Sequence, residues 1–121
     1  MKKVRPERYL GKVDDSPTAQ ESRIASRLGG KRVRGSGASG FSKGDVRDVQ
    51  AAGIEFLVEA KQTIHASLSI KWEWLRKITA EAQAQNCEPA LSIEIKGGKD
   101  DPMVDRDWIM VPARVWEKMK R

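Results

Sequence analysis

Cysteine and histidine are almost absent from this sequence of 121 residues. Cys87 is the only cysteine, so the chain can form neither an intrachain disulfide nor a zinc site built from cysteines. His65 is the only histidine, and we interpret it as a polar loop residue, because a zinc site would need further histidine or cysteine ligands. Without a histidine obviously paired to it, Cys87 is not expected to act as a nucleophile. The single thiol fits a reducing, intracellular compartment.

Long apolar runs are also missing. No stretch approaches the ~20 residues that a helix needs to span a bilayer. The first residues, Met1-Lys2-Lys3, are not followed by the apolar core of a signal sequence. We therefore expect a soluble, cytoplasmic protein, located in the host cytoplasm if the chain is phage-encoded.

Acidic residues are scarce in the first part of the chain. Residues 1–47 contain 12 Lys and Arg against 5 Asp and Glu, whereas residues 48–121 contain 11 against 12. The net charge of +6 and the pI near 9.7 therefore come from the N-terminal part. Such a charge favours polyanionic partners, with nucleic acid as the first candidate and an anionic membrane surface as the second.

The size and hydrophobic content of the chain predict one globular domain. We place it over residues 16–121, after a flexible basic arm formed by residues 1–15, which lack any periodicity. A serine and a proline at its start and two glycines at its end predict a first helix over residues 17–28. Glu21 would lie close to the inner face of this helix.

The remaining elements follow from turn residues and hydrophobic spacing. In chain order, we expect a basic strand at 31–34, a glycine- and serine-rich loop at 35–40, a strand near Asp45-Val46, a turn at Ala52-Gly53, a strand at 54–61, a helix at 69–85, a strand at 90–95, a turn at 96–102, a strand at 107–111 and a helix at 112–120. The predicted order is thus α, β, β, β, α, β, β, α.

The apolar spacing of the long helix at 69–85 predicts one buried stripe. Its members would be Ile70, Trp74, Leu75, Ile78 and Ala82. Trp72 exceeds what one stripe can bury, so it belongs either to the core or to an interface with another chain. We expect two further tryptophans in the core, namely Trp108 and Trp116.

Glu59 and Lys61 are two residues apart in a strand, so their side chains point to the same face. One interpretation is a surface ion pair on an edge strand, which is common and of little energetic value. The alternative is a site, because the strand before Glu59 is apolar, Asp45 lies on the expected neighbouring strand and Glu21 is on a helix that can cover the sheet. Converging carboxylates repel one another unless a cation is present, and all-oxygen ligands favour Mg²⁺ or Mn²⁺.

A magnesium ion held by one or two carboxylates is suited to phosphodiester hydrolysis, because it can activate water and stabilise negative charge. The ammonium of Lys61 would fit this chemistry, since it can hold or help to deprotonate the attacking water and offset developing charge. The candidate metal ligands are therefore Glu21, Asp45 and Glu59.

Asp45 followed by Glu59-Ala60-Lys61 resembles the PD-(D/E)xK nuclease signature, in which an acidic residue precedes a strand bearing (D/E)-x-K. Gly44 stands where that signature has a proline. The surroundings are similar to those of archaeal and phage-type Holliday-junction resolvases over residues 18–112. The matching segments are "QESRIASRLGG", "RGSGASG", "FLVEAKQT" and "CEPALSIEI".

This resemblance implies a restriction-endonuclease-like α/β domain, in which helices flank a central mixed β-sheet. It also implies that Glu21, Asp45 and Glu59 bind the metal ion, that Lys61 is the catalytic lysine and that Ser36 contacts phosphate. Ser39 or Ser42 could take the place of Ser36. Gln62 or Thr63 would border the site.

The resemblance further implies a homodimer, because a four-way junction offers two equivalent strands to a two-fold enzyme.

Candidate DNA-binding residues beyond the arm are Lys31, Arg32, Arg34, Lys43 and Arg47, with Arg23 and Arg27. No base-reading helix is recognisable, which favours structure-selective binding. We expect a magnesium-dependent endonuclease for branched DNA. The alternatives are a restriction-like or nicking nuclease for linear duplex, and a basic DNA-binding protein without catalysis.

Overall fold

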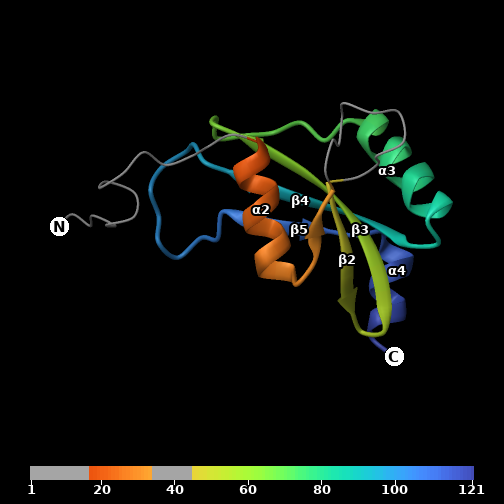
Figure 1. The fold of residues 1–121 in the computed structure, drawn as a ribbon. Helices are drawn as coiled ribbons and strands as arrows, with labels where there is room; N and C mark the ends of the chain where they lie inside the picture. Colours follow the sequence, from red (N-terminus) through yellow and green to blue (C-terminus); the bar gives the residue numbers. More distant parts are fainter. Residues whose placement is uncertain (1–16, 34–44) are drawn as a thin grey trace.

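The computed structural model describes residues 17–33 and 45–121, and their elements follow the predicted order (Figure 1). They are α2 (Pro17–Leu28), β1 (Lys31–Arg32), β2 (Val46–Ala51), β3 (Ile54–Thr63), α3 (Trp72–Ala84), β4 (Glu88–Ile95), β5 (Asp107–Met110) and α4 (Ala113–Met119). The predicted arm at 1–15 and the glycine- and serine-rich loop at 35–40 lie outside the described residues.

The five strands form one mixed sheet in the order β1-β2-β3-β4-β5. Neighbouring strands are antiparallel except for β3 and β4, which run parallel and are joined by the crossover helix α3. The prediction of a single α/β domain with a central mixed sheet is therefore confirmed.

A tight hairpin joins β2 to β3 at the predicted turn. Its two loop residues, Ala52 and Gly53, have φ values of 53° and 74°, as a type I′ turn requires. Further along β2, Val46 pairs with Val58 and Val49 pairs with Phe56, so one extra residue bulges out of β2. This bulge includes Asp48, which has a φ of 61°.

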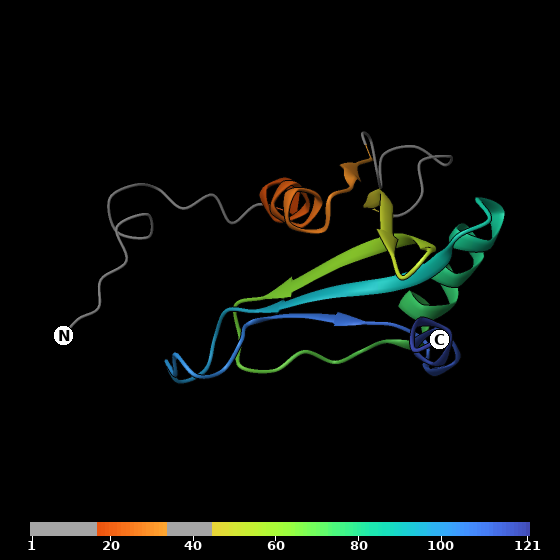
Figure 2. The same ribbon diagram turned by 90° about the horizontal axis from the view of Figure 1, so that it is seen from below.

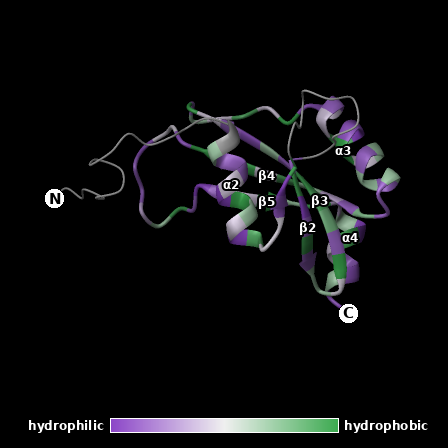
Figure 3. Ribbon diagram, viewed as in Figure 1, coloured by the Kyte–Doolittle hydropathy of each residue, from purple (hydrophilic) through white to green (hydrophobic). Residues whose placement is uncertain are grey.

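Alternate residues of β3 pack against different helices, as the pleat of a strand dictates. Phe56 and Val58 belong to a core cluster with Ile24 and Ala25 of α2. Leu57 points the other way and packs with α3. Figure 2 shows α2 on one side of the sheet and the segment that leads from β3 to α3 on the other. In Figure 3, hydrophobic and hydrophilic residues alternate along α2 and α3, as expected for helices with one buried face.

The long helix starts later than its apolar spacing predicts. It begins at Trp72 rather than at residue 69, because Lys71 has an extended backbone conformation. Ile70 therefore lies before the helix and is exposed, so its assignment to the buried stripe was wrong. Ile78 and Ala82 are buried as predicted, and Trp72 is exposed.

Trp108 and Trp116 do not lie in the core, and the prediction for both was wrong. Their exposed fractions are 54% and 57%. Trp108 is on β5, an edge strand whose residues are mostly exposed. On α4 the fully buried residue is Val115, and its neighbour Trp116 points outward.

Helix α4 is held to the start of β4 by charged hydrogen bonds. Arg114 donates to both carboxylate oxygens of Glu88, at 3.0 and 2.9 Å, and Lys118 donates to one of them at 2.7 Å. These hydrogen bonds, first from Arg114 and then from Lys118, lower the pKa of Glu88 to about 2. Within the described residues, no helix has the length and apolar character needed to cross a membrane.

Candidate active site

The candidate site lies at the start of β2, where the neighbouring strand β3 continues beyond it. The last β2 residue to pair with β3 at this end is Val46, opposite Val58. Asp45, the residue before Val46, continues the hydrogen bonding to β3. Its backbone N–H donates to the Val58 carbonyl at 2.8 Å, and its Oδ2 accepts from the Ala60 N–H at 2.7 Å. The Asp45 side chain thus takes the place of a further strand residue and is fixed beside the Glu59-Ala60-Lys61 segment.

Glu59 and Lys61 point to the same face of β3, as the spacing predicts. Lys61 Nζ lies 3.3 Å from Glu59 Oε2. Glu59 is 8% exposed, and its pKa is raised, first by burial and then by the charge of Asp45, while the ammonium groups of Lys77 and Lys61 oppose this effect. Glu59 is thus a buried carboxylate between two ammonium groups, which differs from an ordinary surface ion pair.

Helix α2 brings Glu21 to the same place. Burial, and then the negative charge of the Asp45 carboxyl group, raise the pKa of Glu21 to about 7. Arg32 lies 3.8 Å from Glu21 and partly offsets this shift. The structure therefore brings the carboxyl groups of Glu21, Asp45 and Glu59 close enough to interact electrostatically, although they come from α2, the residue before β2 and the interior of β3.

The donor atoms at this place suit a hard divalent cation, because they are all carboxylate oxygens. One of them, Glu59 Oε1, is buried and accepts no hydrogen bond. Over residues 17–33 and 45–121, no group of three metal-ligating side chains is arranged to hold an ion. A magnesium ion usually needs only one or two protein carboxylates, because water fills its other positions.

Three residues of α3 complete the surroundings and were not predicted from the sequence as site residues. The Trp74 ring centroid is 4.5 Å from Lys61 Nζ, a cation–π contact. Lys77 Nζ lies 3.7 Å from Glu59 Oε1 and 3.2 Å from Glu81 Oε2. Burial alone would lower the pKa of Lys77, but Glu59 and Glu81 outweigh it and raise the value. The signal in the sequence was the position of Glu81 beside Ala82, on the buried side of the helix.

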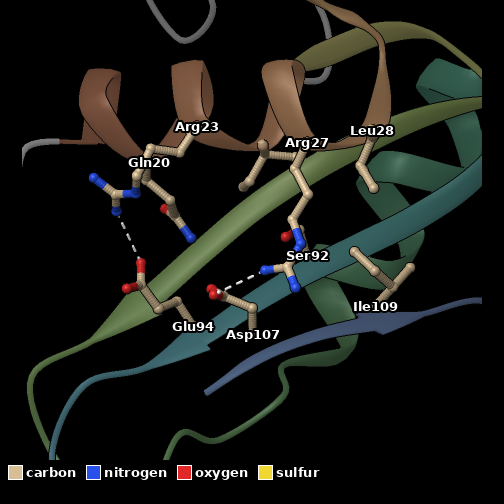
Figure 4. A pocket seen from close by; sticks show the side chains of 9 residues that line it. Gln20, Arg23, Arg27, Leu28, Ser92, Glu94, Asp107 and Ile109 are labelled. Carbon is tan, nitrogen blue, oxygen red and sulfur yellow. Dashed lines mark hydrogen bonds and ion pairs between the residues drawn. The ribbon is translucent and has the colours of Figure 1, made fainter. Parts of the chain in front are cut away.

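Gln20 of α2 supports the strand that carries Lys61. It is almost fully buried, and its side-chain amide donates to the Lys61 carbonyl at 2.8 Å. Gln20 also lines a cavity of about 360 Å³ between α2 and the strands β4 and β5 (Figure 4). Two ion pairs cross this cavity, Arg23 with Glu94 at 3.0 Å and Arg27 with Asp107 at 3.1 Å.

The predicted DNA-binding residues fall into different settings. Lys31 is exposed on β1, Arg32 pairs with Glu21, and Arg47 lies 4.0 Å from Asp48. Arg34 and Lys43 lie outside the described residues. The same is true of the candidate phosphate-contacting serines, Ser36, Ser39 and Ser42. Of the two residues expected to border the site, Thr63 accepts a hydrogen bond from the His65 N–H at 3.0 Å.

Comparison with solved structures connects this geometry to a known fold. The chain is similar to Hjc, a Holliday junction resolvase from the archaeal hyperthermophile Archaeoglobus fulgidus, with a TM-score of 0.54 and 16% sequence identity. The match covers 82% of this chain and 97% of the resolvase chain. No protein-family model matches the sequence, and no curated protein matches it either. The chain thus shares the fold of this resolvase, as the resemblance to archaeal resolvases implied.

Proposed function

We propose that this protein is a metal-dependent endonuclease that hydrolyses phosphodiester bonds in branched DNA. The observation that carries the proposal is the convergence of Glu21, Asp45 and Glu59 beside Lys61, at the start of β2 in a resolvase-like fold. Carboxylates placed this close repel one another, and a divalent cation would relieve the repulsion.

Asp45 and Glu59 would bind the ion, with Glu21 as the third candidate ligand. When bound, Mg²⁺ or Mn²⁺ would supply an activated water and stabilise charge on the phosphate. Lys61 would orient that water and offset negative charge at the phosphorus, because its ammonium is held against Glu59 at 3.3 Å and against the Trp74 ring. The Ala60 N–H orients the Asp45 carboxylate, and the Gln20 side chain holds the Lys61 carbonyl.

The proposed substrate is a four-way DNA junction, and the proposed assembly is a homodimer. Support comes from the fold shared with a resolvase and from the two-fold symmetry of such a junction, which suits an enzyme with two identical sites. The excess of positive charge in residues 1–47 would attract DNA.

Two other functions compete with this proposal. The same fold can host a restriction-like or nicking nuclease that cuts linear duplex, because a fold does not determine its substrate. A DNA-binding protein without catalysis would use the basic residues alone, with Glu59 and Lys61 as an ion pair.

The test is cleavage of a labelled four-way junction and of a linear duplex with the same sequence, each with Mg²⁺ or with EDTA. We expect paired, symmetric nicks in the junction only. The double substitution Asp45→Asn and Glu59→Gln should abolish cleavage and leave DNA binding in place. A matched control, Glu73→Gln, changes an exposed carboxylate on α3 and should cut like the parent.

Each competing function has its own result in this assay. Equal cleavage of the linear duplex would retain the nuclease and reject junction selectivity. DNA that is retarded in a gel but uncut with every metal ion would favour the non-catalytic binding protein. Analytical ultracentrifugation of the protein, alone and with the junction, tests the homodimer.

A further inference from the structure

Glu59 faces an ammonium group at each of its two carboxylate oxygens. Lys61 approaches Oε2 at 3.3 Å, and Lys77 of α3 approaches Oε1 at 3.7 Å. Both distances are longer than the 2.7–2.9 Å typical of a charged hydrogen bond. Oε1 is buried and accepts no hydrogen bond. Lys77 therefore compensates the charge of Glu59 without a short bond to it.

Glu81 gives Lys77 a second carboxylate one helical turn further along α3. The distance from Lys77 Nζ to Glu81 Oε2 is 3.2 Å, shorter than the distance to Glu59. Glu81 is only 8% exposed, and its Oε1 is also buried without a hydrogen bond. An ionised carboxylate is costly to bury, and an apolar residue beside Ala82 would serve the packing of α3 better. The packing of the helix thus does not explain Glu81.

We propose that Lys77 is a positioning residue shared between Glu59 and Glu81, and that Glu81 is the partner that retains Lys77 when Glu59 binds a divalent cation. This inference rests on the proposed function, because that function makes Glu59 a metal ligand. The Lys77 side chain is 57% exposed and flexible, so it can withdraw from Glu59 while staying paired with Glu81.

An ordinary helix pair would have other properties. A lysine four residues before a glutamate is the less favourable order for such a pair, and its members are usually exposed. The exposed pair Glu73 and Arg76 on the same helix, with atoms 2.6 Å apart, shows the usual case. If Lys77 and Glu81 were only a helix pair, their substitution would leave cation binding unchanged.

The test is calorimetric titration of Mn²⁺ into the metal-free protein at pH 8, without DNA. In Glu81→Gln, Glu59 is the remaining carboxylate partner of Lys77, so the ammonium competes with the ion for Glu59. Mn²⁺ binding should weaken by about tenfold, as is typical when a residue that supports a metal ligand is changed. In the double variant Lys77→Met and Glu81→Met, the competing ammonium is gone and the buried charge with it, so binding should become severalfold tighter. The control, Glu73→Gln with Arg76→Met, should bind like the parent.

The proposal predicts weaker Mn²⁺ binding for Glu81→Gln and tighter binding for the double methionine variant. If Lys77 and Glu81 had only a structural role, both variants would bind Mn²⁺ more weakly. That result would overturn it, and so would unchanged binding in Glu81→Gln. Thermal unfolding in EDTA checks that each variant is folded. If Glu81→Gln does not fold, tighter binding by the double methionine variant supports the proposal and weaker or equal binding overturns it. Binding that is absent, or equal in Glu59→Gln, would instead refute the metal site of the proposed function.

Discussion

Glu21 is a carboxylic acid with a pKa of about 7, so it is half protonated near neutral pH in the metal-free protein. The unfolded chain releases this proton near pH 4.5. Between pH 4.5 and 7 the folded state therefore holds a proton that the unfolded state has lost, and its stability falls as the pH rises. Glu59, whose pKa is also raised, contributes in the same direction.

We predict that Glu21→Gln stabilises the metal-free protein at high pH, because glutamine resembles the protonated acid and keeps a polar partner for Asp45. Solvent screening limits the effect to about 1 kcal/mol, which raises Tm by about 4 °C at pH 8 in a domain of this size. At pH 4.5 the variant and the parent should unfold at the same temperature. Thermal unfolding in EDTA between pH 4.5 and 8 measures this, and parallel curves for the two proteins would contradict it.

The residues of the candidate site differ in how well a sequence predicts them. Glu59 and Lys61 follow from the two-residue period of a strand, and Asp45 follows from its place before the adjacent strand. The buried position of Glu81 has a signal in the sequence, but the contact of Lys77 with Glu59 could not be predicted, because it depends on how α3 crosses β3. The two tryptophans placed wrongly, Trp108 and Trp116, are apolar residues for which composition gives no indication of which face stays uncovered.

At the scale of elements, the two glycines that follow α2 are needed for different reasons. One reason is local to the helix end, and the other comes from a strand that is distant in the sequence. Two glycines predict where the helix stops, and Gly29 has a φ of 75°, as expected at a helix end. Position 30 has to be glycine because of the fold. A Cβ at Gly30 would lie 2.5 Å from the Arg47 carbonyl oxygen and 2.6 Å from a Val49 methyl group. Strand β2 passes too close to Gly30 for any side chain.

We predict that Gly30→Ala destabilises the protein by about 2–3 kcal/mol, because the added methyl group forces β2 away. Gly53→Ala is the matched control: its φ is 74°, but a Cβ there meets no atom within 4 Å. The control should therefore cost only about 1 kcal/mol, for the strained backbone. Urea unfolding at pH 7 measures both values, and equal costs would contradict the close approach.

The charged hydrogen bonds of helix α4 all go to one carboxylate, Glu88, whose pKa is lowered to about 2. Its contribution to stability is present above pH 4.5 and is lost as the pH falls from 4.5 towards 2, because protonation breaks its hydrogen bonds to Arg114 and Lys118. We predict that Glu88→Gln lowers Tm by a few degrees at pH 7 and has a much smaller effect at pH 2, where about half of the Glu88 carboxyl groups are already protonated in the folded protein. Glu117→Gln, an exposed change on the same helix, should leave Tm unchanged at both values. A difference as large at pH 2 as at pH 7 would show that packing, not charge, is lost.

At the scale of the whole molecule, the excess of basic residues does not translate directly into positive surface. Arg23 and Arg27 were counted from the sequence as candidates for phosphate contacts. In the structure each is paired with a carboxylate across the cavity under α2, Arg23 with Glu94 and Arg27 with Asp107 (Figure 4). These pairs reduce the positive charge that α2 presents to a polyanion, and a sequence cannot show this because the partners are about 70–80 residues away.

We predict that Glu94→Gln with Asp107→Asn strengthens DNA binding, because the substitutions remove the carboxylates that hold Arg23 and Arg27. Each arginine that then contacts a phosphate releases counterions, so the slope of log K against log salt should steepen by up to about 1.8 on duplex arms. Fluorescence anisotropy from 50 to 300 mM salt measures it. Glu73→Gln with Glu117→Gln makes the same change in net charge elsewhere. If this control binds as tightly as the first variant, net charge alone governs DNA binding and α2 is not part of the contact surface.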